Sequence, residues 1–134
     1  MDSTLPLISG VEHVALIAID PDALADWYQR ALGATVAWAS EKPPRTYLLR
    51  LGNDLLEVGP APVGSSPAPQ PRDAPGLRHL ALAVDDFDAA VATLRERGVR
   101  FTTSELTGAL PSRLIFFTDP EGNHLHLIWR PQAV

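Results

Sequence analysis

The sequence predicts an α+β fold made of two tandem modules, each with the order strand, helix and three strands. The first reason is an internal repeat, because GVEHVALIAIDPDA (10–23) and GLRHLALAVDDFDA (76–89) share seven of fourteen aligned residues. A helical pattern that ends in glycine follows each copy, and runs with the composition of β-strands follow each helix. The two halves therefore have the same predicted architecture.

The first module starts with the strand of the repeat and continues with the helical pattern DALADWYQRALG. Apolar residues at helical spacing give this helix one face to bury. Gly33 ends it, because glycine readily adopts the left-handed conformation that closes a helix. The strands ATVAWAS, TYLLRLG and LLEVG follow, and Asn53 and Asp54 supply the turn between the last two.

The second module repeats this order after its own strand, GLRHLALAVDD. Its helix, DAAVATLRERG, begins among acidic residues that suit the positive end of the helix dipole, and it ends at Gly98. The strands VRFTTSEL, RLIFFT and HLHLIW complete the module, and the turn residues DPEGN precede the last strand. We therefore expect four strands in each half.

We expect the chain of 134 residues to form a single domain, with module 1 at 10–60 and module 2 at 76–130. The segment 61–75 between them is rich in proline and almost without large apolar residues, which predicts an extended linker. An apolar content of 46% is sufficient for a hydrophobic core. A ferredoxin-like βαββαβ sandwich uses similar elements, but it would not account for the hairpin that ends in HLHLIW.

Composition excludes several classes of protein. With a net charge near −5 and Lys42 as its one lysine, the chain lacks the basic surface that nucleic-acid binding requires. It has no cysteine, which excludes disulfides and thiolate metal ligands. The sequence shows neither a secretory signal nor an apolar run long enough for a membrane span. We expect a cytoplasmic protein whose partner is a small molecule.

His13 and His79 occupy equivalent positions in the first strands of the two modules. Because side chains alternate across a strand, each histidine lies on the face opposite the bulky residues that pack against the helix. Ala15 and Ala81 stand two positions further along the same face and leave space for a ligand. A single histidine in a strand is more often structural, so the argument depends on the repetition of this pattern.

The last strands of the two halves extend this pattern, because Glu57 of LEV aligns with His126 of LHL. A carboxylate between apolar neighbours requires a partner, and a cation would supply one. A pseudo-twofold relation between the halves would bring four side chains together: His13, Glu57, His79 and His126. Imidazole and carboxylate ligands suit Zn, Ni, Fe(II), Mn or Co. We predict a divalent metal ion bound by these four residues, with His124 at the rim of the pocket.

Other strand residues are candidates for contact with the substrate: Trp38, Arg45, Tyr47 and Arg113. An arginine in the pocket would recognise a carboxylate or phosphate group. The alternative is that the aromatic residues belong to the core and that the arginines are solvated.

The segments GVEHVALIAID, LLEVG, GLRHLALAVDD and FFTDPEGNHLHLIW make the chain resemble the vicinal oxygen chelate superfamily. This superfamily includes glyoxalase I, extradiol dioxygenases, methylmalonyl-CoA epimerase, fosfomycin-resistance enzymes and bleomycin-binding proteins. The resemblance covers about 10–129 and implies a curled eight-stranded mixed sheet with the helices on its outer face, a divalent metal at the pseudo-twofold axis and frequently a homodimer. His13, His79 and Glu57 match ligand positions of the superfamily, whereas His126 stands where many members carry glutamate.

The resemblance implies a metal-dependent enzyme that binds adjacent oxygens of a small substrate, and it favours glyoxalase-I-like lyase, isomerase or epimerase chemistry. This chemistry requires a general base, and Glu57 could serve as the catalytic base only by loosening from the metal. The histidine at position 126 argues against a simple glyoxalase I assignment. One alternative is an Fe(II) extradiol-type ring-cleavage dioxygenase with three protein ligands. The other is a non-catalytic protein that binds a small molecule or drug and confers resistance.

Overall fold

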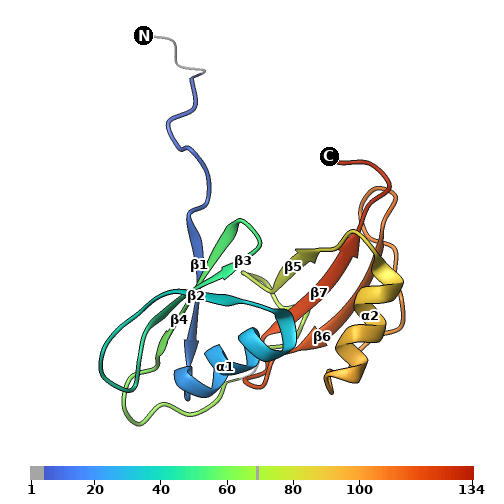
Figure 1. The fold of residues 1–134 in the computed structure, drawn as a ribbon. Helices are drawn as coiled ribbons and strands as arrows, with labels where there is room; N and C mark the ends of the chain where they lie inside the picture. The colour runs from blue at the N-terminus through green and yellow to red at the C-terminus, as the bar shows by residue number, and fades with distance from the viewer. Residues whose placement is uncertain (1–4, 69) are drawn as a thin grey trace.

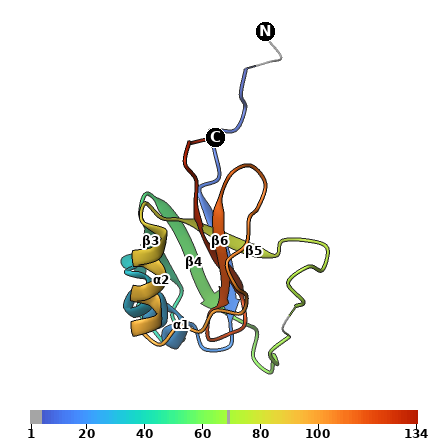
Figure 2. The same cartoon turned by 90° about the vertical axis from the view of Figure 1, so that its right-hand side faces the viewer.

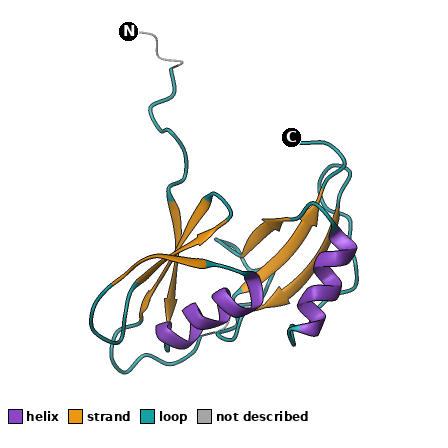
Figure 3. Cartoon of the chain, viewed as in Figure 1, coloured by secondary structure: helices purple, strands orange, loops and turns teal. Residues whose placement is uncertain are grey.

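A computed structural model describes residues 5–68 and 70–134 (Figure 1). Module 1 contains β1 (His13–Ala18), α1 (Pro21–Leu32), β2 (Thr35–Ala39), β3 (Tyr47–Leu51) and β4 (Asp54–Pro60). Module 2 contains β5 (His79–Ala83), α2 (Phe87–Glu96), β6 (Arg113–Thr118) and β7 (His124–Trp129). Figure 3 shows two groups of strands, each with a helix beside it. The predicted order of elements is confirmed apart from one strand.

Both helices begin at an aspartate cap; α1 ends at the predicted glycine, whereas α2 ends at Glu96, two residues before Gly98. The carboxylate of Asp20 accepts a hydrogen bond from the backbone N–H of Ala23, and that of Asp86 accepts one from Ala89. Gly33 ends α1 in the left-handed conformation, with φ at 75°. Neither helix in the described ranges is long and apolar enough to cross a membrane.

The strands form two sheets within the described residues. The first has the order β1-β4-β3-β2 and the second has the order β5-β7-β6, each with one parallel pair that involves its first strand. β1 and β5 are therefore edge strands and are not hydrogen-bonded to each other. The expected single eight-stranded sheet is not formed within one described chain; four strands and three strands pair separately.

The prediction of a continuous strand in VRFTTSEL is wrong. This segment makes only isolated bridges to β6. Its Thr103 Oγ1 accepts the backbone N–H of Phe116 at 3.1 Å, so a side chain occupies the place of a backbone acceptor and interrupts the ladder. The sequence pattern showed the apolar alternation of this segment but not the competing side-chain hydrogen bond.

The helices cover one side of the molecule, and the linker projects from the other side (Figure 2). Between the helices and the sheets, the buried apolar side chains of both modules form one cluster. Tyr28 and Leu49 contribute to it from module 1, and Phe117 and Leu125 contribute from module 2; all four are fully buried. The second face of each sheet is left outside this core.

Polar contacts also join the two modules on the side of α1. The hydroxyl of Tyr28 donates to Asp119 Oδ2 at 2.8 Å, and both residues are buried. The carboxylate of Glu121 accepts the backbone N–H groups of Ile19 and Asp20 at 2.6 and 2.9 Å. The turn before β7 is thereby fixed to the loop before α1, which sets how the two sheets lie relative to each other.

Candidate functional site

The face of the first sheet opposite α1 carries the candidate ligands of module 1. Residues that pair directly across strands share a face. One row across the four strands consists of Trp38, Leu48, Glu57 and Ala15. The neighbouring row consists of Thr35, Arg50, Leu55 and His13. The buried residues Leu49 and Leu56 occupy the other face, toward the core.

His13 and Glu57 form a partly exposed pair on this face. His13 Nε2 lies 3.1 Å from Glu57 Oε2, and His13 Nδ1 lies 2.8 Å from Glu12 Oε1. Because carboxylates only accept hydrogen bonds, each of these contacts requires a proton or a cation at the ring nitrogen. A cation at Nε2 would replace that proton and would have an oxygen ligand beside it, so this pair fits a metal ion.

The second sheet carries the equivalent pair, since Ala81 pairs with His126 as Ala15 pairs with Glu57. The rings of His79 and His126 have centroids 4.7 Å apart. Both rings also pack edge-on against Phe116, with centroid distances of 5.4 and 4.9 Å. The strand register therefore pairs residues at equivalent positions in the two modules, as predicted.

The protonation of His126 also suits a metal ligand. Its Nδ1 lies 3.1 Å from the backbone carbonyl oxygen of Leu127. A carbonyl only accepts, so Nδ1 carries the proton and Nε2 keeps a free lone pair. Burial is the main factor that lowers the pKa of His126; the neighbouring charges of His79 and Arg130 act in the same direction, against the hydrogen bond to Leu127. A neutral imidazole with a free Nε2 is the form that binds metals.

The two pairs do not meet within one chain. Among the described residues, no group of three or more His, Asp or Glu side chains is close enough to hold a metal ion. The pairs lie on separate sheets, whose relative position is set by the contacts of Tyr28 and Glu121. The convergence within the chain that the repeat suggested is therefore not observed, and each module carries half of the candidate site.

Arg45 and Tyr47 lie together, but away from Glu57. Tyr47 pairs with Val58 and so shares the core side of the sheet. Its hydroxyl donates to Asp22 Oδ1 at 2.5 Å, and this hydrogen bond is the main factor that raises the pKa of Tyr47. Arg45 approaches the same carboxylate oxygen at 3.5 Å. The predicted contact of these two residues with substrate gains no support from their positions.

Arg113 is held by two carboxylates. It donates to Asp88 at 2.9 and 3.2 Å and to Glu105 at 2.8 and 3.0 Å, and its guanidinium lies over the ring of Phe87. These hydrogen bonds lower the pKa values of both carboxyl groups. The charge of Arg113 is therefore matched by Asp88 at the start of α2 and by Glu105. The sequence did not predict these two partners.

His124 lies on the same face as His126, one row nearer the turn, as predicted. Its Nε2 donates to the backbone carbonyl of Gln70 in the linker at 2.8 Å, whereas its buried Nδ1 has no partner in the described residues. The guanidinium of Arg72 stacks over Phe116 at 4.8 Å. The linker therefore contacts the candidate face of module 2, although we expected it only to separate the modules.

The groove between the modules contains two cavities of about 690 and 580 Å³. The edge strands β1 and β5 line both cavities. His79 and His124 line the smaller one, but His13, Glu57 and His126 line neither. The larger volume is thus separate from the candidate ligand pairs.

Arg50 is a residue of the candidate face that we did not single out from the sequence. It is exposed and shares a row with Leu55 and His13. The alternation in TYLLRLG could have identified it, because Arg50 and Leu48 have the parity opposite to the buried Leu49. Trp38, which we did predict, lies on the same face and is 53% exposed.

The fold and these paired positions define the class of protein. The chain belongs to the glyoxalase/bleomycin resistance protein/dioxygenase superfamily, whose family model matches residues 10–127. The predicted resemblance is thereby confirmed.

Several relatives match the chain over most of its length. It is 35% identical to the uncharacterized protein YaeR of Escherichia coli (strain K12), over 90% of this chain and 95% of YaeR. It is 29% identical to the mitochondrial methylmalonyl-CoA epimerase of Homo sapiens, over 85% of this chain and 68% of the epimerase. A glyoxalase family protein from Enterococcus faecalis has a TM-score of 0.76 at 28% identity and covers 92% of this chain and 99% of its own.

Proposed function

We propose that this protein is a metal-dependent enzyme that binds adjacent oxygens of a small substrate and catalyses isomerase, epimerase or lyase chemistry at a carbon next to a carbonyl. The observation that carries the proposal is the pair of ligand-type side chains at matching register positions in each module, His13 with Glu57 and His79 with His126. Membership of a superfamily with enzymes such as the related human epimerase supports it.

We further propose that two copies of the chain complete one site, with module 1 of one copy facing module 2 of the other. Protein sites for these ions use three or four protein ligands, so one pair is insufficient. The outer edges of β1 and β5, which pair with no strand of the described residues, support an assembly of this kind, because such edges are available for contact with another chain. A symmetric homodimer would contain two such sites.

The residues of the chain have distinct roles in this proposal. A bound divalent ion would polarise two adjacent substrate oxygens and stabilise negative charge on them. Glu57 would leave the ion to accept the proton from the carbon next to the carbonyl, and would then return it to the substrate. The hydrogen bond from His126 Nδ1 to the carbonyl of Leu127 orients that ring, and Glu12 orients His13.

Metal content tests the ligand set. The protein is purified under air and without oxygen, supplemented with divalent metals and assayed by elemental analysis. We expect His79→Ala and His126→Ala to lose bound metal, whereas His124→Ala, one row away on the same strand as His126, retains it. Retention of metal by His79→Ala would refute the ligand set. A metal-free wild-type protein after supplementation would instead indicate a binding protein.

Mixing two variants tests the shared site. Glu57→Ala has an intact pair only in module 2, and His126→Ala has an intact pair only in module 1. After the two are unfolded and refolded together, half of the dimers contain one chain of each kind, and each of these has one complete site. We therefore expect about a quarter of the wild-type metal content in the mixture and almost none in either variant alone. No gain on mixing would contradict a shared site.

Turnover tests the chemistry. We expect oxygen-independent conversion of a hemithioacetal or a 2-oxo acid derivative, together with exchange of the proton next to the carbonyl for solvent deuterium. Glu57→Gln should abolish that exchange. Bound iron together with oxygen uptake on catechols would assign the protein to the dioxygenases instead.

A further inference from the structure

Arg50 lies on the ligand face of module 1 at a defined distance from the candidate ligands. It pairs with Leu55 of β4, and Leu55 pairs with His13 of β1, so Arg50 is two strands away in the same row. Adjacent strands are about 4.8 Å apart, which places the Cα atoms of Arg50 and His13 roughly 10 Å apart. A long side chain from Arg50 can therefore reach a molecule bound at His13 without competing for the same ligand position.

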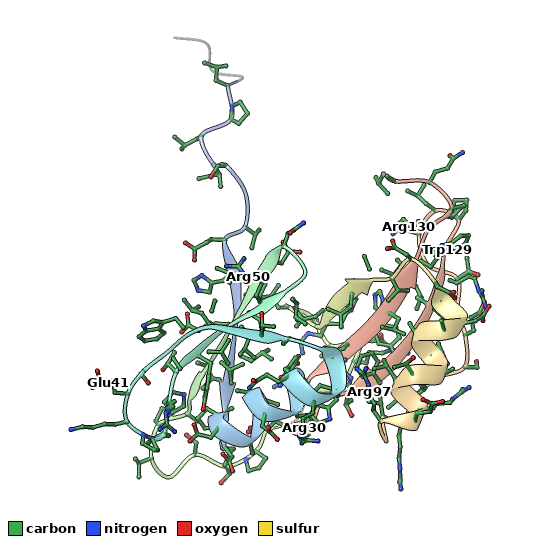
Figure 4. The ribbon with its side chains drawn as sticks, viewed as in Figure 1. Arg30, Glu41, Arg50, Arg97, Trp129 and Arg130 are labelled. Atoms are coloured by element: carbon green, nitrogen blue, oxygen red, sulfur yellow. The ribbon has the colours of Figure 1, made fainter. Side chains whose placement is uncertain are left out.

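The charge of Arg50 is not matched by a carboxylate in the described part of the chain. In residues 5–68 and 70–134 it makes no ion pair, although several other arginines do. These are Arg30 with Asp26, Arg45 with Asp22, Arg72 with Asp73, and Arg113 with Asp88 and Glu105. Figure 4 shows Arg50 on the first sheet and Arg30 on α1. Unlike those four arginines, Arg50 makes no ion pair among the described residues, and it lies on the same face of the sheet as Glu57.

The surroundings of Arg50 also suit a bound molecule. Trp38 stands in the neighbouring row with Glu57 and exposes half of its surface. An exposed tryptophan beside an unpaired guanidinium provides an apolar wall and a charged anchor. Thr118 occupies the corresponding position of module 2, so only one of the two modules offers this anchor.

We propose that Arg50 determines specificity by binding an anionic oxyacid group, a carboxylate or a phosphate, of the substrate, at a distance from the two oxygens that define the reacting end. This inference rests on the proposed function. It assigns the substrate to small oxygen-rich anions with one charged terminus. The planar guanidinium is suited to this role, because it can donate two parallel hydrogen bonds to either group.

Three hydroxamates with the same chelating head test this role by isothermal titration of metal-supplemented protein. Acetohydroxamate is neutral at its tail, succinohydroxamate adds a carboxylate, and phosphonoacetohydroxamate adds a phosphonate. We expect the wild type to bind at least one charged probe roughly 10- to 100-fold more tightly than acetohydroxamate, as for a hydrogen bond between charged groups. The charged probe with the larger ratio identifies the group that Arg50 recognises.

Arg50→Gln should reduce this preference to about one while leaving metal content and acetohydroxamate affinity unchanged. Arg50→Lys should retain part of the preference, since it keeps the charge but loses the planar fork. Arg30→Gln is the matched control, because Arg30 is an exposed arginine on α1, and it should keep the full preference. A preference that persists in Arg50→Gln, or its absence in the wild type, would overturn the inference alone. If no hydroxamate bound, the proposed function would fail as well.

Discussion

Replacement of Tyr28 by phenylalanine tests the contact that holds the two modules together. The Tyr28 hydroxyl donates to Asp119 Oδ2 at 2.8 Å, and the two residues are 0% and 4% exposed, so water cannot replace the lost donor. A hydrogen bond to a carboxylate contributes about 1.5–3 kcal/mol. Asp119 keeps three N–H donors, from Glu121 and Asn123, which favours the lower part of this range. We expect Tyr28→Phe to lower the free energy of unfolding by about 2 kcal/mol.

Urea unfolding followed by circular dichroism measures this change, and the melting temperature should fall by about 8 °C for a chain of this size. Tyr47→Phe is the matched control, because it removes the same atom from a half-buried hydrogen bond to Asp22 and should lower the free energy of unfolding by only about 0.5–1 kcal/mol. Equal losses in the two variants would refute the assignment of a buried intermodule contact.

The same contact predicts how stability depends on pH. Burial, and then the carboxylate of Asp119, raises the pKa of Tyr28 above its ordinary value of 10.0. The folded chain therefore keeps a proton that the unfolded chain releases, and stability falls as the pH rises above about 10. Tyr28→Phe should make this alkaline decline shallower, and a decline as steep as that of the wild type would contradict the linkage.

Three further changes test single features of the fold by urea unfolding. Gly33→Ala should lower stability by about 1–2 kcal/mol through backbone conformation alone, because φ is 75° and an added Cβ would meet no atom within 4 Å; an unchanged midpoint would contradict this. Phe117→Ala should lower stability by about 3–5 kcal/mol, since Phe117 is 0% exposed, whereas a loss below about 1 kcal/mol would exclude it from the core. Hydrogen bonds from Arg113 lower the pKa values of Asp88 and Glu105, so the stability that they confer is fully present above the ordinary carboxyl range and is lost as the pH falls below it through the lowered pKa values. Arg113→Gln should flatten the acid slope, and parallel slopes would refute this.

The fold could be predicted because its signals are local and occur twice. Helix bounds follow from capping residues such as Asp86 and Gly33, and strand faces follow from alternation. The strand predicted in VRFTTSEL is not formed as a continuous strand, because the side chain of Thr103 accepts the backbone N–H of Phe116 in β6. Such a contact joins residues that are distant along the chain, and periodicity does not reveal it.

The candidate site could be predicted only within each module. Alternation placed Glu57 and His126 on the same face as the first-strand histidines, and the register of the parallel pairs agrees. Tyr47 shares its parity with the buried Leu49 and packs against the core, which agrees with the alternative stated for the aromatic residues. The separation of the two pairs could not be foreseen, since it depends on how Tyr28 and Asp119 join the modules.

The two modules carry similar residues on the core face of their sheets and different residues on the opposite face. On the helix side both carry large apolar residues at matching positions, Leu56 with Leu125 and Val58 with Leu127, because a shared core tolerates little change in volume. On the open side Glu57 corresponds to His126 and Arg50 corresponds to Thr118. None of these four residues belongs to the apolar core cluster, although His126 is buried beside Phe116. A molecule bound between one face of each kind would meet Glu57 and Arg50 beside His13 at one end, and the imidazoles of His79 and His126 at the other. Its two ends could therefore not be interchanged.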